Sequence, residues 1–181
     1  IIDVFEAGSK GYETEHVVDG SEKFALPGLW DMHVHFRGGD SLEMYNKKML
    51  PLYIANGITG VRDAGGDLTS SIISWKFQIN SRYVIGPRLY YSGPKLDGPD
   101  ARWEGSLEVS NEAEVMAALD SLESLNANYV KIYDSTLDAN TYMAILKEAE
   151  KRGLKVTGHL PMTVMLDDAL NAGLDGIEHL Y

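Results

Sequence analysis

The stretch LPGLWDMHVHF, Leu26 to Phe36, is an apolar run that ends in two histidines one residue apart. Its β-branched and aromatic residues predict a strand. Side chains at positions i and i+2 of a strand face the same side, so His33 and His35 project together, with Cα atoms roughly 7 Å apart. Two such imidazoles can bind one metal ion, but the same pattern also arises by chance. The rest of the chain has to decide between these interpretations.

Downstream of Ala25, strand-like and helix-like segments alternate. The predicted strands are 30–36, 57–65, 88–93, 129–134, 155–161 and 176–181, and the predicted helices are 42–56, 69–80, 112–125, 141–152 and 164–172. Strands that alternate with helices in this way are consecutive β/α units of a parallel sheet. No G-x-G-x-x-G or Walker loop follows a strand, which lowers the odds of a nucleotide-binding sheet. We therefore predict an α/β fold of the (β/α)8 TIM-barrel type, represented by about six units.

Composition excludes several classes of protein. The 181 residues are 44% hydrophobic, which suits one globular core, and 16 Lys and Arg against 27 Asp and Glu give a net charge of −11. Such a chain has no basic surface for nucleic acid, and no apolar run approaches the roughly 18 to 20 residues of a membrane helix. We expect a soluble protein, either cytoplasmic or periplasmic or secreted. Without cysteine, a metal site must use histidine, carboxylates or a modified side chain.

The run YVKIYD places a lysine inside the predicted barrel. Strand alternation sends Val130 and Ile132 toward the helices, and Tyr129, Lys131 and Tyr133 toward the interior. Burying a lysine costs several kcal/mol unless it is paired, neutralised or modified. A salt bridge to an interior carboxylate is the plain interpretation of Lys131.

Two further histidines stand at the ends of predicted strands, His159 in VTGHLP and His179 in GIEHLY. A single histidine in such a place is usually a hydrogen-bonded core or rim residue. Yet four of the five histidines of the chain lie at C-terminal strand ends, and only His16 does not. Barrel enzymes carry their chemistry at this face, so a shared metal site explains the placement best.

The blocks LPGLWDMHVHF, GITGVRDAGG, VKIYDS, VTGHLP and GIEHL, in this order and spacing, resemble the metal-dependent amidohydrolase superfamily. The likeness is greatest to its prolidase-like and imidazolonepropionase-related branch, and it extends from Ala25 to Tyr181. It implies two divalent metal ions. Zinc suits these ligands best, although cobalt, manganese or iron are chemically tolerated.

The resemblance also implies a role for each ligand. His33 and His35 match the pair that binds the more buried metal. Lys131 matches the lysine that reacts with carbon dioxide to form a carbamate bridging both metals. His159 and His179 match the ligands of the second metal. The implied reaction is hydrolysis of an amide bond by a hydroxide that bridges the ions.

Other residues near this centre have weaker claims. Arg62 could hold a substrate carboxylate or form a local ion pair with Asp63, and Tyr133 could donate a hydrogen bond to the substrate carbonyl or serve only in packing. Asp134 and Glu178 flank ligands, but alternation points them away, so we expect no role for them.

The superfamily pattern is incomplete in this chain. A barrel needs eight strands, and the resemblance implies an aspartate at the end of the eighth that no residue here matches. We assign residues 1–24, which predict short strands joined by turns, to an N-terminal β-sandwich remnant, and 25–181 to a partial barrel carrying the metal site. The expected partners are barrel strands seven and eight and a second copy of the chain.

We therefore expect a dipeptidase-type amidohydrolase acting on C–N bonds of a small amide, such as a dipeptide or an N-acyl amino acid. Two alternatives stay open. Lys131 could be a Schiff-base lysine of an aldolase-like barrel. The chain could also be a non-catalytic or incomplete barrel fragment that lacks the general base of strand eight.

Overall fold

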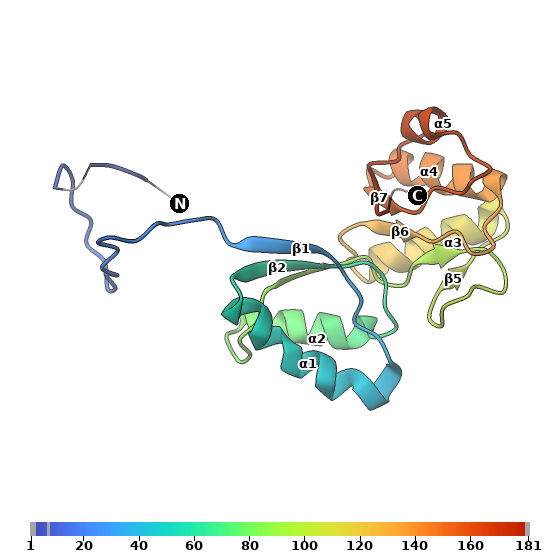
Figure 1. Cartoon of the computed structure of the whole chain (residues 1–181). Coiled ribbons are helices and arrows are strands. Elements are labelled where there is room, and N and C mark those ends of the chain that lie inside the picture. The colour runs from blue at the N-terminus through green and yellow to red at the C-terminus, as the bar shows by residue number, and fades with distance from the viewer. Residues whose placement is uncertain (1–2, 7, 180–181) are drawn as a thin grey trace.

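A computed structural model describes residues 3–6 and 8–179. Helices and parallel strands alternate along most of the chain, as Figure 1 shows, although β3, β4 and β5 follow one another without a helix. The elements, in order, are β1 (Leu29–Val34), α1 (Gly39–Ala55), β2 (Ile58–Asp63), α2 (Thr69–Asn80), β3 (Arg88–Tyr91), β4 (Leu96–Asp97), β5 (Leu107–Glu108), α3 (Glu112–Ser124), β6 (Val130–Ile132), α4 (Ala139–Lys151), β7 (Val156–Gly158), α5 (Leu166–Asn171) and β8 (Gly176–Ile177).

The strands form two parallel sheets that follow one another. Their orders are β1-β2-β3 and β5-β4-β6-β7-β8, and every paired neighbour runs parallel. The amide of Asn128 donates to the Tyr91 carbonyl at 2.8 Å, which continues the hydrogen bonding from the first sheet toward the second. Among the described residues β8 does not pair with β1. The predicted α/β barrel architecture is confirmed as an open arrangement of strands.

All five predicted helices and five of the six predicted strands are present, with shifts at their ends. The predicted strand 176–181 is a strand only over Gly176–Ile177, and its residues 180–181 lie outside the described part of the chain. Strands β4 and β5 were not predicted, because each contains only two residues and so offers no alternating pattern. Asn111 caps α3, since its side chain accepts from the Glu114 amide at 3.0 Å. Helix α4 begins slightly earlier than predicted because Asp138 caps it.

Each sheet has its own hydrophobic core against the helices that cover it. Leu50, Val61 and Trp75 belong to the core between the first sheet and helices α1 and α2. Val130 and Ile132 belong to the second core, which α3 and α4 complete. The predicted outward direction of these two β6 side chains is confirmed. The opposite face of the strands is left for polar residues.

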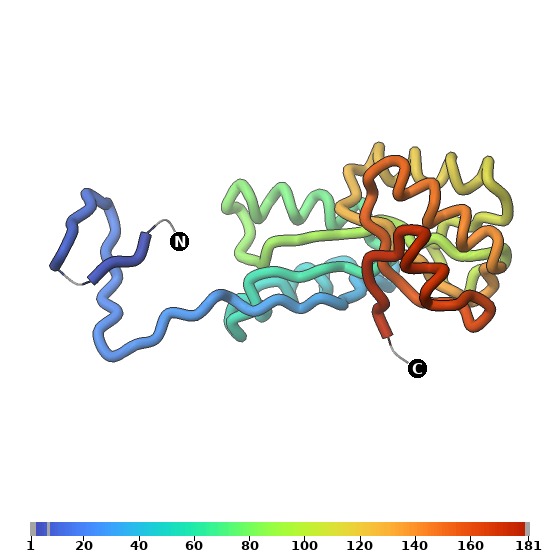
Figure 2. Tube along the Cα trace, turned by 90° about the horizontal axis from the view of Figure 1, so that it is seen from above, coloured from blue at the N-terminus to red at the C-terminus, as the bar shows by residue number. Residues whose placement is uncertain are grey.

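The N-terminal segment differs from prediction. Residues 3–6 and 8–24 contain no strand, and their side chains are exposed. Figure 2 shows this segment leading away from the layered part of the molecule. A short strand needs hydrogen-bonding neighbours, and none of the described residues supplies them here. The predicted strands are therefore wrong, whereas the assignment of the segment to a β-sandwich remnant stays a prediction.

Candidate functional site

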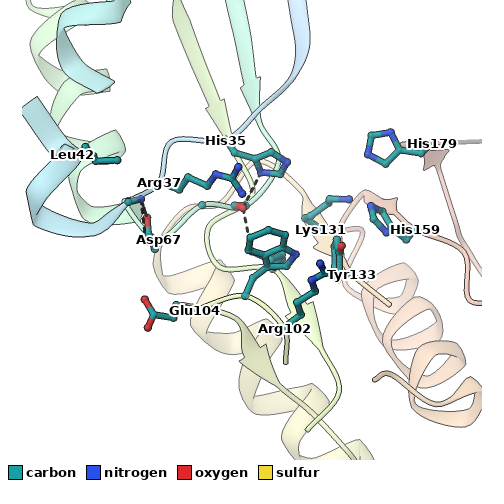
Figure 3. A pocket seen from close by; sticks show the side chains of 15 residues that line it. His35, Arg37, Leu42, Asp67, Arg102, Glu104, Lys131, Tyr133, His159 and His179 are labelled. Carbon is teal, nitrogen blue, oxygen red and sulfur yellow. Dashed lines mark hydrogen bonds between the residues drawn. The ribbon is translucent and has the colours of Figure 1, made fainter. Parts of the chain in front are cut away.

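A pocket of about 730 Å³ opens beyond the C-terminal ends of the strands. His35, Lys131, Tyr133, His159 and His179 all line it. In the view of Figure 3, His35 lies on one side, His159 and His179 lie on the other, and Lys131 extends between them. The structure thus brings together side chains from strand ends distributed over most of the chain.

His33 and His35 direct the same ring nitrogen toward a common point. Their Nε2 atoms lie 3.0 Å apart. The Nδ1 atom of His33 lies 2.7 Å from a Glu178 carboxylate oxygen, and that of His35 lies 3.0 Å from the Gly65 carbonyl oxygen. Carboxylates and carbonyls only accept hydrogen bonds, so each Nδ1 must carry the hydrogen. In the neutral rings, both Nε2 atoms then present bare lone pairs to each other.

Two lone pairs at this separation repel, and only a proton or a cation near both relieves the repulsion. Two nitrogens bound to one zinc ion at about 2.0–2.1 Å each would be roughly 3 to 3.4 Å apart, so the observed separation fits one shared ion. Partial burial lowers the pKa of His35 to about 4, against the opposing effect of the hydrogen bond that its ring donates to the Gly65 carbonyl. The ring of His35 is therefore neutral at neutral pH, which is the form that binds a metal.

The four histidines form a continuous row of ring contacts. His33 packs on His179 with ring centres 4.6 Å apart, and His179 lies 5.1 Å from His159. Tyr133 follows at 4.3 Å from His159. Among residues 3–6 and 8–179, no three His, Asp or Glu side chains form a complete metal cluster on their own.

Lys131 is the most unusual group in the pocket. It is 1% exposed, and within the described chain its Nζ atom has no hydrogen-bond partner. The expected salt bridge between Lys131 and an interior carboxylate is not formed among the described residues. Burial lowers its pKa to about 8, and the charges of Arg62 and Lys95 act in the same direction against the attraction of Glu178. A reactive neutral amine is thus much more accessible than in a solvated lysine.

Glu178 was expected to play no part, and this expectation is wrong. Its carboxylate accepts from His33, from Arg62 at 2.6 and 2.7 Å, and from the Thr157 hydroxyl at 2.5 Å, and its side chain is only 3% exposed. Burial alone would raise its pKa, but these hydrogen bonds and the charges of Arg62 and Lys131 lower it overall. Glu178 therefore joins the last strand to the first sheet as a buried anion.

Arg62 is held by the same network. It donates to Glu178 and, through Nε, to the Met32 carbonyl at 2.8 Å. The local ion pair with Asp63 considered above is not formed. Arg62 does not line the pocket described here, and its suggested contact with a substrate carboxylate stays a prediction that this pairing disfavours.

Asp134 was also discounted, yet its carboxylate lies 2.8 Å from Nδ1 of His159. The expectations for Asp134 and Glu178 were wrong for the same reason. Strand β6 ends at Ile132 and β8 at Ile177, so strict alternation does not govern the residues that follow. An acid one or two residues after the end of a strand is the signal that could have identified both.

Two buried charged residues near the pocket were not recognised in the sequence. Lys95 is 6% exposed and donates to the Gly65 carbonyl at 3.3 Å, the same oxygen that holds His35. Asp63 is 1% exposed and accepts from the amides of Phe36 and Gly65. Burial raises the pKa of Asp63 to about 6 against these hydrogen bonds. Together they fix the loops that carry His35.

Comparison with known proteins decides the family. A model of the amidohydrolase family matches residues 24–181. The chain belongs to the amidohydrolase family. No curated protein sequence matches it. The described part of the chain shares part of the barrel fold of its structural neighbours, as the resemblance in the sequence implied. Members of the family are generally metal-dependent.

Solved structures agree with this assignment. One amidohydrolase structure is 25% identical to this chain, with a TM-score of 0.72. The match covers 94% of this chain and 52% of the amidohydrolase. Bottromycin amidohydrolase is 25% identical with a TM-score of 0.71, covering 86% and 32% respectively. A Xaa-Pro dipeptidase with bound methionine in its active site is 23% identical with a TM-score of 0.67, covering 83% and 47%. The chain spans about a third to a half of these proteins.

No helix in the described part of the chain has the length and apolar character needed to cross a bilayer.

Proposed function

We propose that the full-length protein is a metal-dependent hydrolase that cleaves an amide bond of a small substrate, such as a dipeptide or an N-acyl amino acid. The observation that carries the proposal is the pair of facing Nε2 atoms of His33 and His35, in a pocket that also holds the Lys131 amine, which has no hydrogen-bond partner among the described residues. The family match supports the hydrolytic chemistry.

The residues present fit two divalent ions. His33 and His35 would hold one ion, and His159 and His179 would hold the other, with Lys131 between the two pairs. Zinc is the ion that imidazole ligands suit well. Such ions lower the pKa of water and polarise a carbonyl. Glu178 and Asp134 keep their respective histidine rings oriented through Nδ1.

Lys131 would contribute as a carbamate. Its neutral amine adds to carbon dioxide, so that a nitrogen–carbon bond forms and one proton leaves. This converts a buried cation into an anionic oxygen ligand. The lowered pKa of Lys131 and the absence of a partner for Nζ within the described residues both favour this reaction. Tyr133 lines the same pocket and would donate its hydroxyl hydrogen to the substrate carbonyl.

Elemental analysis of the full-length protein tests the proposal. We expect bound divalent metal in the wild type, and the loss of about one equivalent in His33→Ala. His16→Ala is the matched control, because His16 is exposed and lies in the N-terminal segment. A metal-free wild type, or equal loss in both variants, would refute the metal site. Carbon-13 NMR after growth with labelled bicarbonate should show a carbamate that is absent from Lys131→Met.

A further inference from the structure

Two arginines stack on one tryptophan at the rim of the pocket. The guanidinium carbon of Arg37 lies 5.1 Å from the ring centre of Trp103, and that of Arg102 lies 5.6 Å from it. Arg37 follows β1, whereas Arg102 and Trp103 lie between β4 and β5. All three line the pocket of the candidate metal site, and Figure 3 shows both arginine side chains there.

Neither arginine forms an ion pair with a described residue. The acids that line the pocket are Asp67 and Glu104. Asp67 already accepts from the backbone amides of the Gly38–Gly39 turn. The other lining cations are Lys95 and Lys131, so the pocket is locally basic in a chain whose net charge is −11.

Stacking explains how the two arginines can act together. A guanidinium that lies against an indole keeps its N–H edge available, because the contact uses the face of the ion. The indole also reduces the freedom of both side chains. The planar fork of arginine matches a carboxylate in a two-point hydrogen bond. Arg37 and Arg102 therefore present donors to an anion bound at the rim, a few residues from the ligand His35.

We propose that Arg37 and Arg102, ordered by Trp103, bind a carboxylate of the substrate. This rests on the proposed function and narrows it: the substrate class is small amides that carry a free carboxylate beside the scissile bond, such as dipeptides and N-acyl amino acids. Arg62, the first candidate for this role, is held by Glu178 instead. A basic rim in an acidic protein also concentrates anionic substrates at the metal centre.

Binding to the metal-free full-length protein tests the site apart from catalysis. The probes are N-acetyl-L-leucine and N-acetyl-L-leucinamide, which differ in charge but hardly in shape, and the method is isothermal titration calorimetry. We expect the acid to bind about tenfold more tightly than the amide, and this preference to disappear in Arg37→Gln and in Arg102→Gln. Arg102→Lys should keep part of it, because it retains charge and loses the fork.

Arg88→Gln is the matched control. Arg88 stacks on Trp30 at 5.2 Å, the same kind of contact, but lies outside the pocket. Its removal should leave the preference for the acid unchanged. Equal binding of acid and amide by the wild type, or an equal loss in Arg88→Gln, would overturn the proposal. Tighter binding of inorganic phosphate than of the acid would also overturn it, in favour of a phosphate site.

Turnover separates this proposal from the proposed function. If both hold, Arg102→Gln should raise KM for N-acetyl-L-leucine or a dipeptide by about tenfold, while metal content stays that of the wild type. Arginine-dependent binding of the acid without any hydrolysis would refute the hydrolase and support the carboxylate site. Hydrolysis that is equally efficient for the neutral amide, and insensitive to both arginine variants, would support the hydrolase and refute the carboxylate site.

Discussion

Replacing Glu178 by glutamine is expected to destabilise the metal-free protein by about 3 kcal/mol. The side chain of Glu178 is 3% exposed and that of its partner Arg62 is 19% exposed, with 2.6 Å between the nearest atoms. Removing one member of a buried ion pair typically costs roughly 3–5 kcal/mol, because the other charge is left uncompensated. The partial exposure of Arg62 and its hydrogen bond to the Met32 carbonyl favour the lower end of this range.

Urea unfolding followed by far-UV circular dichroism measures this change. Removing both charges, in Arg62→Met with Glu178→Gln, should restore stability to within about 1 kcal/mol of the wild type. Glu123→Gln is the matched control. Glu123 pairs with Arg152 at 2.8 Å on the surface, where its side chain is 45% exposed, and its loss should cost less than about 1 kcal/mol.

The pH dependence gives a second check. The pKa of Glu178 is lowered in the folded protein from its ordinary 4.5, so its contribution is fully present above that value. It is lost as the pH falls through the lower folded pKa. The wild type should therefore lose more stability on acidification than Glu178→Gln. A cost no larger than that of Glu123→Gln, or a double variant no more stable than the single one, would show that this network does not hold the last strand to the first sheet.

Three further predictions concern single groups. Asp138→Ala should lower stability by about 1 kcal/mol in urea unfolding, because Asp138 accepts from the Thr141 amide at 3.1 Å to cap α4; no change would mean that the cap is not formed in solution. Gly66→Ala should lower the melting temperature and weaken metal binding, because a Cβ there would lie 1.8 Å from the Phe36 carbonyl oxygen. In the metal-free protein, the His35 ring should titrate near pH 4 by NMR, and a midpoint near 6.5 would contradict its partial burial.

The sequence predicted which histidines come together, for a geometric reason. In a parallel sheet with helical crossovers, all strands end at one face, so residues at strand ends converge even when they are distant in sequence. This applies to His33 on β1, to His35 directly after it, and to His159 and His179 near β7 and β8. The ring contacts among these histidines follow from that arrangement.

The partners of these ligands could not be predicted in the same way. Glu178 and Asp134 lie past the last residue of their strands, where backbone direction depends on the loop and not on the pleat. Lys95 precedes β4, which is too short to show a pattern. The stacking of Arg37 and Arg102 on Trp103 joins two loops, and no local periodicity encodes such a contact.

Of three buried or half-buried cations near the pocket, Lys131 is the one expected to lower the stability of the folded protein. Arg62 forms an ion pair with the carboxylate of Glu178, and Lys95 donates a hydrogen bond to the Gly65 carbonyl. Lys131 has no hydrogen-bond partner among the described residues. Its pKa of about 8, against an ordinary 10.5, corresponds to a penalty of about 3 kcal/mol for the charged amine at neutral pH, since one pH unit equals about 1.4 kcal/mol.

Lys131→Met should therefore stabilise the metal-free protein at pH 7, by about 1–3 kcal/mol, while it abolishes binding of the proposed metal pair. The unfolded chain holds the Lys131 proton more tightly than the folded one, so the stability of the wild type should rise between pH 8 and about 10.5. The difference between the two proteins should shrink over this interval in urea unfolding at several pH values. A variant that is less stable than the wild type at pH 7 would mean that the amine already has a stabilising partner. The physical argument for the proposed carbamate would then be refuted.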